Sequence, residues 1–219
     1  MYKQGKMYYS PSDLTKYMES PFASWMDRLT QEYPELVPEK DPSDDFMVML
    51  QQKGYAHEDK LETQFIAEGK NLIKIEGNND SEKYNRTLEA MKNGTEVIVQ
   101  ARLEFGQFAG FADFLVKVVH ESEQSPSKLG NWHYEVWDTK LASRVRPTFI
   151  IQLCCYAQML DSIQGCLPQS ITVALGNGEI EVLRTHDFYY YYFNLKDKFL
   201  DEHAKFHLDR CPDPADSKS

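Results

Sequence analysis

The sequence predicts a mixed α/β (α+β) fold, in which a central mixed sheet is flanked by helices and preceded by an N-terminal helical segment. Three observations predict this class. Residues 10–94 carry helix starts and helical spacing, and residues 95–185 carry alternating apolar positions separated by turn residues. Residues 187–207 then return to a helical pattern.

Length and composition fit one globular domain. The chain has 219 residues, of which 42% are hydrophobic and 13% aromatic, so it can bury one sizeable core. We expect this domain to span residues 10–208, between a flexible start at 1–9 and a tail or truncated linker at 209–219. The sequence holds neither a membrane span nor a signal-peptide pattern, which predicts a cytoplasmic protein.

Charge and cysteine content narrow the class of function. The formal net charge of −10 argues against a broad basic surface that grips nucleic acid. A metal-dependent nuclease is still compatible with it, since such a site needs carboxylates and only a local basic strip. The four cysteines form no C-x-x-C pair, and Cys154 and Cys155 lie in an apolar helical pattern typical of buried free thiols. Neither disulfides nor a zinc site are predicted.

Two Ser-Pro pairs begin the helical part. Ser10 can cap a helix that has Pro11 and Asp13 in its first turn. Ser20-Pro21 repeats the arrangement and predicts a second short helix that ends at about Leu29.

A proline-containing loop is expected at 32–45, followed by helices over about 45–67 and 81–92. An apolar stripe on the first of these helices includes His57, so this side chain is expected to face inward. Taken alone, a histidine in this position is more often a core residue with a satisfied hydrogen bond. The stripe consists of Phe46, Leu50, His57, Leu61 and Phe65.

The next segment predicts an antiparallel pair of strands at 95–105 and 108–119, joined at Gly106. Asp113 lies among apolar residues of the second strand. A buried carboxylate without a partner costs roughly several kcal/mol, so either a cation or a salt bridge must accompany it. Gly110 allows a backbone or a substrate to approach closely. The first strand is expected to place Val97, Val99, Ala101, Leu103 and Phe105 on one face.

A third strand ends in Asp138-Thr139-Lys140. At a period of two residues, Asp138 and Lys140 point to the same side. Such an acid and amine suit a metal-dependent attack on phosphate, because the carboxylate can hold a hard cation while the ammonium steadies the nucleophile or the developing charge. A solvated ion pair on the strand surface is the alternative.

A basic stretch with Arg144 and Arg146 leads into a helix that begins at Pro147. Gln152 and Tyr156 are four residues apart on this helix and share a face. Their structural alternatives are a surface amide and ordinary core packing.

The chain closes with a hairpin and a helix. A Gly-Asn-Gly turn joins strands at 171–175 and 179–183. The final helix, at about 187–207, is rich in tyrosines that could stack on bases, although their helical spacing favours packing against the sheet.

In this order the pieces resemble the RecB-like branch of the PD-(D/E)XK nuclease superfamily, which is related to CRISPR-associated and helicase-fused exonucleases. The resemblance covers about residues 10–208 and is especially close to RecB-like nucleases of bacteria. It implies a restriction-endonuclease-like core and a Mg²⁺- or Mn²⁺-dependent deoxyribonuclease of the prokaryotic cytoplasm. The matching motifs are Gly54-Tyr-Ala-His57-Glu58, Gly110-Phe-Ala-Asp113, Asp138-Thr-Lys140 and Gln152-Leu-Cys-Cys-Tyr156.

The resemblance also implies roles for the residues of these motifs. His57, Asp113 and Asp138 would be ligands of Mg²⁺ or Mn²⁺, with the Thr139 carbonyl as a further ligand. Lys140 would position or activate the attacking water and stabilise the developing charge.

The remaining residues would serve the substrate. Gln152 and Tyr156 would orient Lys140 or the DNA backbone, and Arg144 and Arg146 would contact phosphates. The implied partners are single-stranded or end-containing DNA and a fused or associated helicase, in DNA repair, processing or defence. No membrane partner is expected.

This sequence departs from the family pattern in its cysteines. Many relatives hold an iron–sulfur cluster with one N-terminal cysteine and three C-terminal cysteines. Here no cysteine precedes Cys154, Ser20 stands where the first ligand would fall, and only Cys211 lies in the C-terminal region. No iron–sulfur cluster is expected.

Two other classes of function stay open. The first is a catalytically silent nucleic-acid-binding or scaffold domain on the same fold, which the charge of −10 favours. The second is a protein-interaction module in which Asp113 and Asp138 are structural acids. Exonuclease or endonuclease action, strand polarity and DNA or RNA preference do not follow from the sequence.

Overall fold

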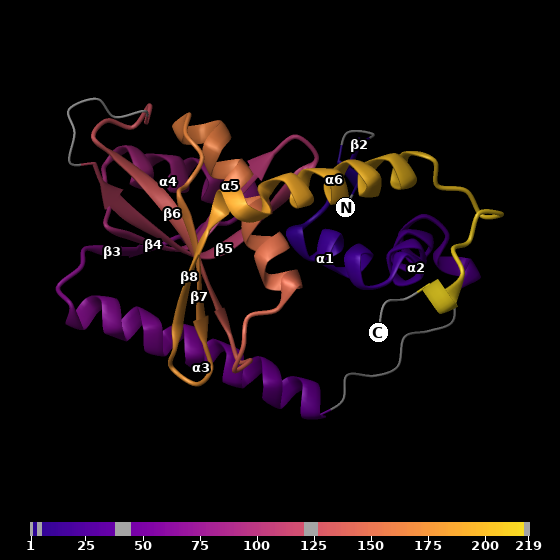
Figure 1. Ribbon diagram of the computed structural model, residues 1–219, viewed down its shortest axis with the longest axis horizontal. Coiled ribbons are helices and arrows are strands. Elements are labelled where there is room, and N and C mark those ends of the chain that lie inside the picture. Colours follow the sequence, from indigo (N-terminus) through magenta and orange to yellow (C-terminus); the bar gives the residue numbers. More distant parts are fainter. Residues whose placement is uncertain (1, 4–5, 38–44, 121–126, 217–219) are drawn as a thin grey trace.

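The structure, a computed structural model, describes residues 2–3, 6–37, 45–120 and 127–216. A six-stranded sheet in the order β3-β4-β5-β6-β7-β8 lies at its centre, with helices on both faces (Figure 1). The predicted mixed α/β class and central mixed sheet are confirmed. Within the described ranges, no helix combines the length and the apolar character needed to cross a membrane.

The two predicted Ser-Pro helix starts are confirmed. In α1 (Pro11–Glu19), the Asp13 N–H donates to Ser10 Oγ at 3.2 Å and the Ser10 N–H donates to Asp13 Oδ2 at 2.7 Å, which is a capping box. In α2 (Pro21–Glu32), Ser20 Oγ accepts from the backbone of Ala23. A short 3₁₀ helix, η1 (Pro34–Leu36), follows, while 38–44 of the expected loop lie outside the described residues.

The segment before α1 is tied to the sheet, whereas the sequence suggested a flexible start. Strands β1 (Tyr2–Lys3) and β2 (Lys6–Met7) form an antiparallel pair. The Tyr9 N–H then donates to the Gln107 carbonyl at 2.8 Å, and the Tyr9 carbonyl accepts from Ala109 at 2.9 Å. Tyr9 is itself buried.

The sheet contains both predicted hairpins. β4, β5 and β6 are antiparallel neighbours, β6 runs parallel to β7, and β7 pairs antiparallel with β8. β3 is parallel to β4 and was not predicted, because a strand this short shows no clear alternation. Part of the polar loop expected after β5, 121–126, lies outside the described residues. The bounds are β3 Leu72–Lys74, β4 Val97–Phe105, β5 Phe108–Val119, β6 Trp132–Lys140, β7 Ser170–Leu175 and β8 Ile180–Arg184.

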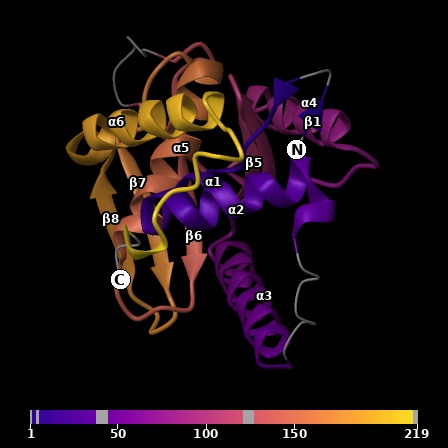
Figure 2. The ribbon, with the colours of Figure 1, turned by 90° about the vertical axis from the view of Figure 1, so that its right-hand side faces the viewer.

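The helices divide between the two faces of the sheet (Figures 1 and 2). The larger core contains side chains of α1, α4, α5 and α6, whereas α3 packs on the opposite face through Leu61 and Phe65. The C-terminal cap of α5 is Gly165, whose φ of 76° is a left-handed conformation that glycine adopts readily. The bounds are α3 Asp45–Ala67, α4 Asp80–Lys92, α5 Pro147–Gln164 and α6 Thr185–Ala204.

Only the C-terminal half of the predicted α3 stripe is buried. Leu61 and Phe65 are 5% and 4% exposed, but Phe46 is 56% exposed and Leu50 is half-buried. The N-terminal half of the helix extends beyond the sheet (Figure 2), so it has no sheet surface to cover. The expected stripe was therefore wrong for the first half of α3.

Candidate functional site

A break in the β4–β5 ladder defines the centre of the site. The two strands pair in constant register from Val97↔Val116 to Phe105↔Phe108, except at the row where Gln100 faces Asp113. Gln100 has φ 53° and is the only non-glycine residue with positive φ in the described chain. This left-handed conformation is costly for a residue with a Cβ and recurs at functional sites.

At this row, the alternation of side chains between the two faces of the sheet shifts by one residue in both strands. Val99 and Phe114 pack in the cluster beneath α3, whereas Ala101 and Ala112 pack in the larger core on the other face. The expectation that Val97, Val99, Ala101, Leu103 and Phe105 share one face was therefore wrong. The left-handed Gln100 shifts the alternation, and Phe105 is exposed. Asp113 consequently lies where the strand passes from one face to the other.

Thr139 holds the Asp113 carboxylate. Its backbone N–H and its hydroxyl both donate to Asp113 Oδ2, at 2.9 and 3.0 Å. These two contacts fix Asp113 against the end of β6. They identify Thr139 as a positioning residue for Asp113; its carbonyl, the expected metal ligand, takes no part in them.

The buried carboxylate of Asp138 and the half-buried ammonium of Lys140 form an ion pair, with Lys140 Nζ 2.6 Å from Asp138 Oδ2. Asp138 is only 3% exposed. Burial and the neighbouring Asp113 carboxylate raise the pKa of Asp138 to about 7, although Lys140 opposes the shift. The predicted same-side placement of the acid and the amine is confirmed.

Glu58 is a third acid of this site that the sequence did not single out. Gln100 Nε2 donates to Glu58 Oε2 at 2.8 Å, which places the carboxyl of α3 beside the break in the ladder. Burial, followed by the charge of Asp113, raises the pKa of Glu58 to about 7. Its position directly after His57 in the first motif was the available signal.

His57 faces a different neighbour. Its Nε2 lies 3.1 Å from the Ala174 carbonyl of β7, and the ring borders a small pocket with Gly178 and Ile180. Successive helical residues point about 100° apart, so His57 and Glu58 cannot both face Asp113. The structure brings Glu58 to the acids and turns His57 toward the β7–β8 hairpin.

The charge balance of the site suits a cation. The charge of Asp113 raises the pKa of both Glu58 and Asp138, and among the described residues Lys140 is the ammonium that forms an ion pair with these acids. No three His, Cys, Asp or Glu side chains among the described residues are already arranged as a metal site. A hard divalent ion would match the all-oxygen donors and compensate their charge.

Tyr156 of α5 supports the strand before Asp113. Its hydroxyl donates to the Phe111 carbonyl at 2.6 Å. Burial raises the pKa of Tyr156, and the charges of Asp138 and Asp113 raise it further, so the side chain stays a phenol. Gln152, one turn earlier, is half-buried and has no hydrogen-bond partner in the part of the chain that the structure describes.

Arg144 and Arg146 are exposed in the loop between β6 and α5, where neither forms an ion pair with a described residue. The Arg146 guanidinium lies 5.9 Å from the centre of the Phe149 ring, and Lys140 Nζ lies 5.4 Å from the same ring. One aromatic ring thus lies between the exposed guanidinium of Arg146 and the half-buried ammonium of Lys140.

A groove with a volume of about 910 Å³ adjoins the site at Tyr156. Gly110 and Phe111 form part of its wall, and the N-terminal turn of α1 borders it. Gly110 leaves no room for a side chain, because a Cβ there would lie 2.8 Å from the Tyr156 hydroxyl and 2.9 Å from Pro11 Cδ. The sequence predicted the close approach of a backbone or a substrate at Gly110, whereas the atoms that approach it here belong to the side chains of Tyr156 and Pro11.

Comparisons with known proteins give no family for the chain. No protein-family model matches it, and no curated protein matches it either. Its function is therefore inferred from its own residues.

Proposed function

We propose that this chain is a metal-dependent nuclease with a restriction-endonuclease-like core, similar to the RecB-like PD-(D/E)XK enzymes. The observation that carries the proposal is the ion pair of the buried Asp138 and the half-buried Lys140, 2.6 Å apart and beside Asp113. The element order α3-β3-α4-β4-β5-β6-α5-β7, with β6 parallel to β7, supports it. It places both acids on adjacent central strands.

The acids would hold Mg²⁺ or Mn²⁺. Asp113 and Asp138 are the protein ligands, and the geometry favours Glu58 over His57 as the third. When bound, such a cation polarises phosphate oxygens and eases the deprotonation of water. The two hydrogen bonds from Thr139 hold Oδ2 of Asp113, so the other carboxylate oxygen of Asp113 stays available for the cation.

Lys140 would act on the nucleophile. Without a cation, its ammonium neutralises Asp138. Once the carboxylate has a cation, Lys140 can orient the attacking water and stabilise the negative charge that develops on the phosphate. Phe149 borders the ammonium and limits its directions of movement.

The substrate would be single-stranded or end-containing DNA. Arg144 and Arg146 provide charge for phosphates beside Lys140, while Gln152 and Tyr156 orient the lysine or the DNA backbone. Because the chain as a whole is acidic, a fused or associated helicase would deliver the DNA to this strip. We place this activity in prokaryotic DNA repair, processing or defence in the cytoplasm.

A cleavage assay tests the proposal. End-labelled single- and double-stranded DNA is incubated with the wild type in Mg²⁺, in Mn²⁺ and in EDTA, and with Asp138→Asn, Lys140→Gln and the distant control Arg184→Gln. We expect cleavage only with the metals, loss in the first two variants and no change in the control. If the folded wild type and both site variants are equally inert, the nuclease proposal fails. DNA binding without cleavage would instead favour a silent nucleic-acid-binding domain.

A further inference from the structure

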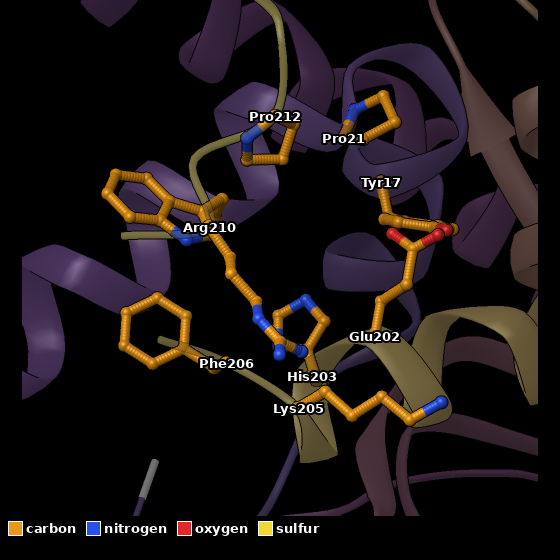
Figure 3. A pocket seen from close by; sticks show the side chains of 9 residues that line it. Tyr17, Pro21, Glu202, His203, Lys205, Phe206, Arg210 and Pro212 are labelled. Carbon is orange, nitrogen blue, oxygen red and sulfur yellow. The ribbon is translucent and has the colours of Figure 1, made fainter. Parts of the chain in front are cut away.

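A second cavity lies between the N-terminal helices and the C-terminal segment (Figure 3), and Glu58, Asp113 and Asp138 are not among its lining residues. Its volume is about 340 Å³, at the small end of the roughly 300–1,000 Å³ typical of ligand pockets. Its walls come from α1, α2, α6 and the chain after α6. They consist of Tyr17, Pro21, Trp25, Glu202, His203, Lys205, Phe206, Arg210 and Pro212.

Three buried polar atoms on these walls have no aligned hydrogen-bond partner among the described residues. They are the Tyr17 hydroxyl, which lies against Glu202, and the ring nitrogens Trp25 Nε1 and His203 Nδ1. The other nitrogen of His203 lies 2.9 Å from Ser24 Oγ. An indole N–H can only donate, and leaving a buried donor unpaired costs about 1–3 kcal/mol. An acceptor from outside the described chain would satisfy the Trp25 N–H.

The two ends of the cavity have opposite charge. In Figure 3, the Arg210 side chain extends from the C-terminal segment into the space bordered by His203 and Phe206. It forms no ion pair with a described acid, whereas Lys205 pairs with Asp201 at 2.6 Å. At the other end, the Glu202 carboxylate lies against Tyr17 and 3.8 Å from Lys198 Nζ, and it contributes, after burial, to raising the pKa of the Tyr17 hydroxyl.

The middle of the cavity is aromatic. The rings of Trp25 and Phe206 are in contact, with centroids 5.6 Å apart and planes tilted by 40°. Pro21 and Pro212 add apolar surface. A flat ring would bury its faces against this surface, and aromatic contacts of this kind contribute about 0.5–1.5 kcal/mol beyond their area.

We propose that this cavity binds a nucleoside monophosphate. The phosphate would pair with Arg210, an acceptor on the base would receive the Trp25 N–H, and a base N–H would face Glu202. An aromatic carboxylic acid has no hydrogen-bond donor for Glu202. In an aromatic amino acid, the ammonium donor and the carboxylate are attached to the same carbon and do not span the cavity from Glu202 to Arg210. In a nucleotide, the base N–H and the phosphate lie at opposite ends of the molecule.

Binding is tested by calorimetry in EDTA, which removes metal-dependent binding at the acidic site, so the result is independent of the proposed nuclease activity. AMP, GMP, CMP and UMP are titrated into the wild type, with adenosine and ribose 5-phosphate as probes that lack the phosphate or the base. The variants are Arg210→Gln and Trp25→Phe. Arg184→Gln and Trp132→Phe remove an arginine and an indole N–H elsewhere, and Asp138→Asn disables the acidic site.

We expect saturable binding of at least one monophosphate and affinities about tenfold lower or more for both partial probes. Each of Arg210→Gln and Trp25→Phe should weaken binding by about tenfold or more, and the three other variants should leave it unchanged. Arg210 is exposed, so its substitution leaves the fold intact. Failure of all four nucleotides to bind the folded wild type overturns the proposal. So does binding that survives either cavity substitution, or that ribose 5-phosphate matches.

Discussion

Gln100 of β4 lies directly opposite Asp113 of β5, at the unpaired row of the ladder between these two strands. Its left-handed backbone moves both strands from one face of the sheet to the other, and its amide donates to Glu58 of α3 at 2.8 Å. One strained residue thus determines where Asp113 lies and which carboxyl meets it.

The strain at Gln100 can be measured by substitution. Alanine has a Cβ that disfavours φ 53°, whereas glycine does not, so Gln100→Ala should be less stable than Gln100→Gly by about 1 kcal/mol. Urea unfolding of the two variants gives this difference. At the exposed Glu104 of the same strand, where φ is not positive, alanine should be the more stable of the two. An alanine variant at least as stable as glycine at position 100 would show that the left-handed backbone is not retained.

The acids predict how stability depends on pH in EDTA. Asp138 and Glu58 have pKa values of about 7 in the fold, above their usual 3.8 and 4.5, so the folded protein binds protons more tightly than the unfolded chain. Their contribution is most favourable below the usual values and is lost as pH rises through about 7. The free energy of unfolding should fall by about 1–3 kcal/mol from pH 5 to 7.5.

The variant Asp138→Asn separates this effect from other titrations. It removes one of the two acids with raised pKa, so its stability should vary less over the same pH range. Glu181→Gln, on the exposed strand β8, should keep the wild-type pH profile. Denaturant titrations at each pH provide the comparison. A wild-type profile that rises toward pH 7.5 would mean that the charged forms of these carboxyls are not destabilised by burial and by the charge of Asp113.

Gly110 gives a test of the packing behind the site. A methyl group there would collide with the Tyr156 hydroxyl and Pro11, so Gly110→Ala should lower the free energy of unfolding by about 1–3 kcal/mol. Gly54 lies in α3 with open space around its Cβ position, so Gly54→Ala should raise stability by about 0.5–1 kcal/mol. Chemical denaturation measures both. Equal effects at the two positions would contradict the close approach of α5 and α1 to β5.

The sequence predicted those elements whose signals are local. The capping box of Ser10 and Asp13 and the proline that begins α5 at Pro147 depend on residues within one helical turn. The same-side placement of Asp138 and Lys140 followed from strand alternation alone. For that reason the order of helices and strands, and the pair at the end of β6, could be read without a structure.

The features of the site that the sequence did not predict depend on contacts between segments that are far apart in the chain. Gln100 and Glu58 are 42 positions apart. A glutamine does not by itself indicate a left-handed backbone, and a glutamate does not by itself indicate a raised pKa. The position of His57 depends on β7, which lies far along the chain, at Ala174. No local pattern could decide between His57 and Glu58 as the side chain that faces Asp113.

The most direct test of the account is the binding of Mn²⁺, because it needs no knowledge of the substrate. Electron paramagnetic resonance of free Mn²⁺ during a titration should show binding to the wild type that is weakened about tenfold or more by Asp138→Asn and by Glu58→Gln. His57→Gln should leave the affinity unchanged, since this ring faces Ala174. Equal binding of Mn²⁺ by the wild type and Asp138→Asn would contradict the proposal that these carboxyls hold the catalytic metal.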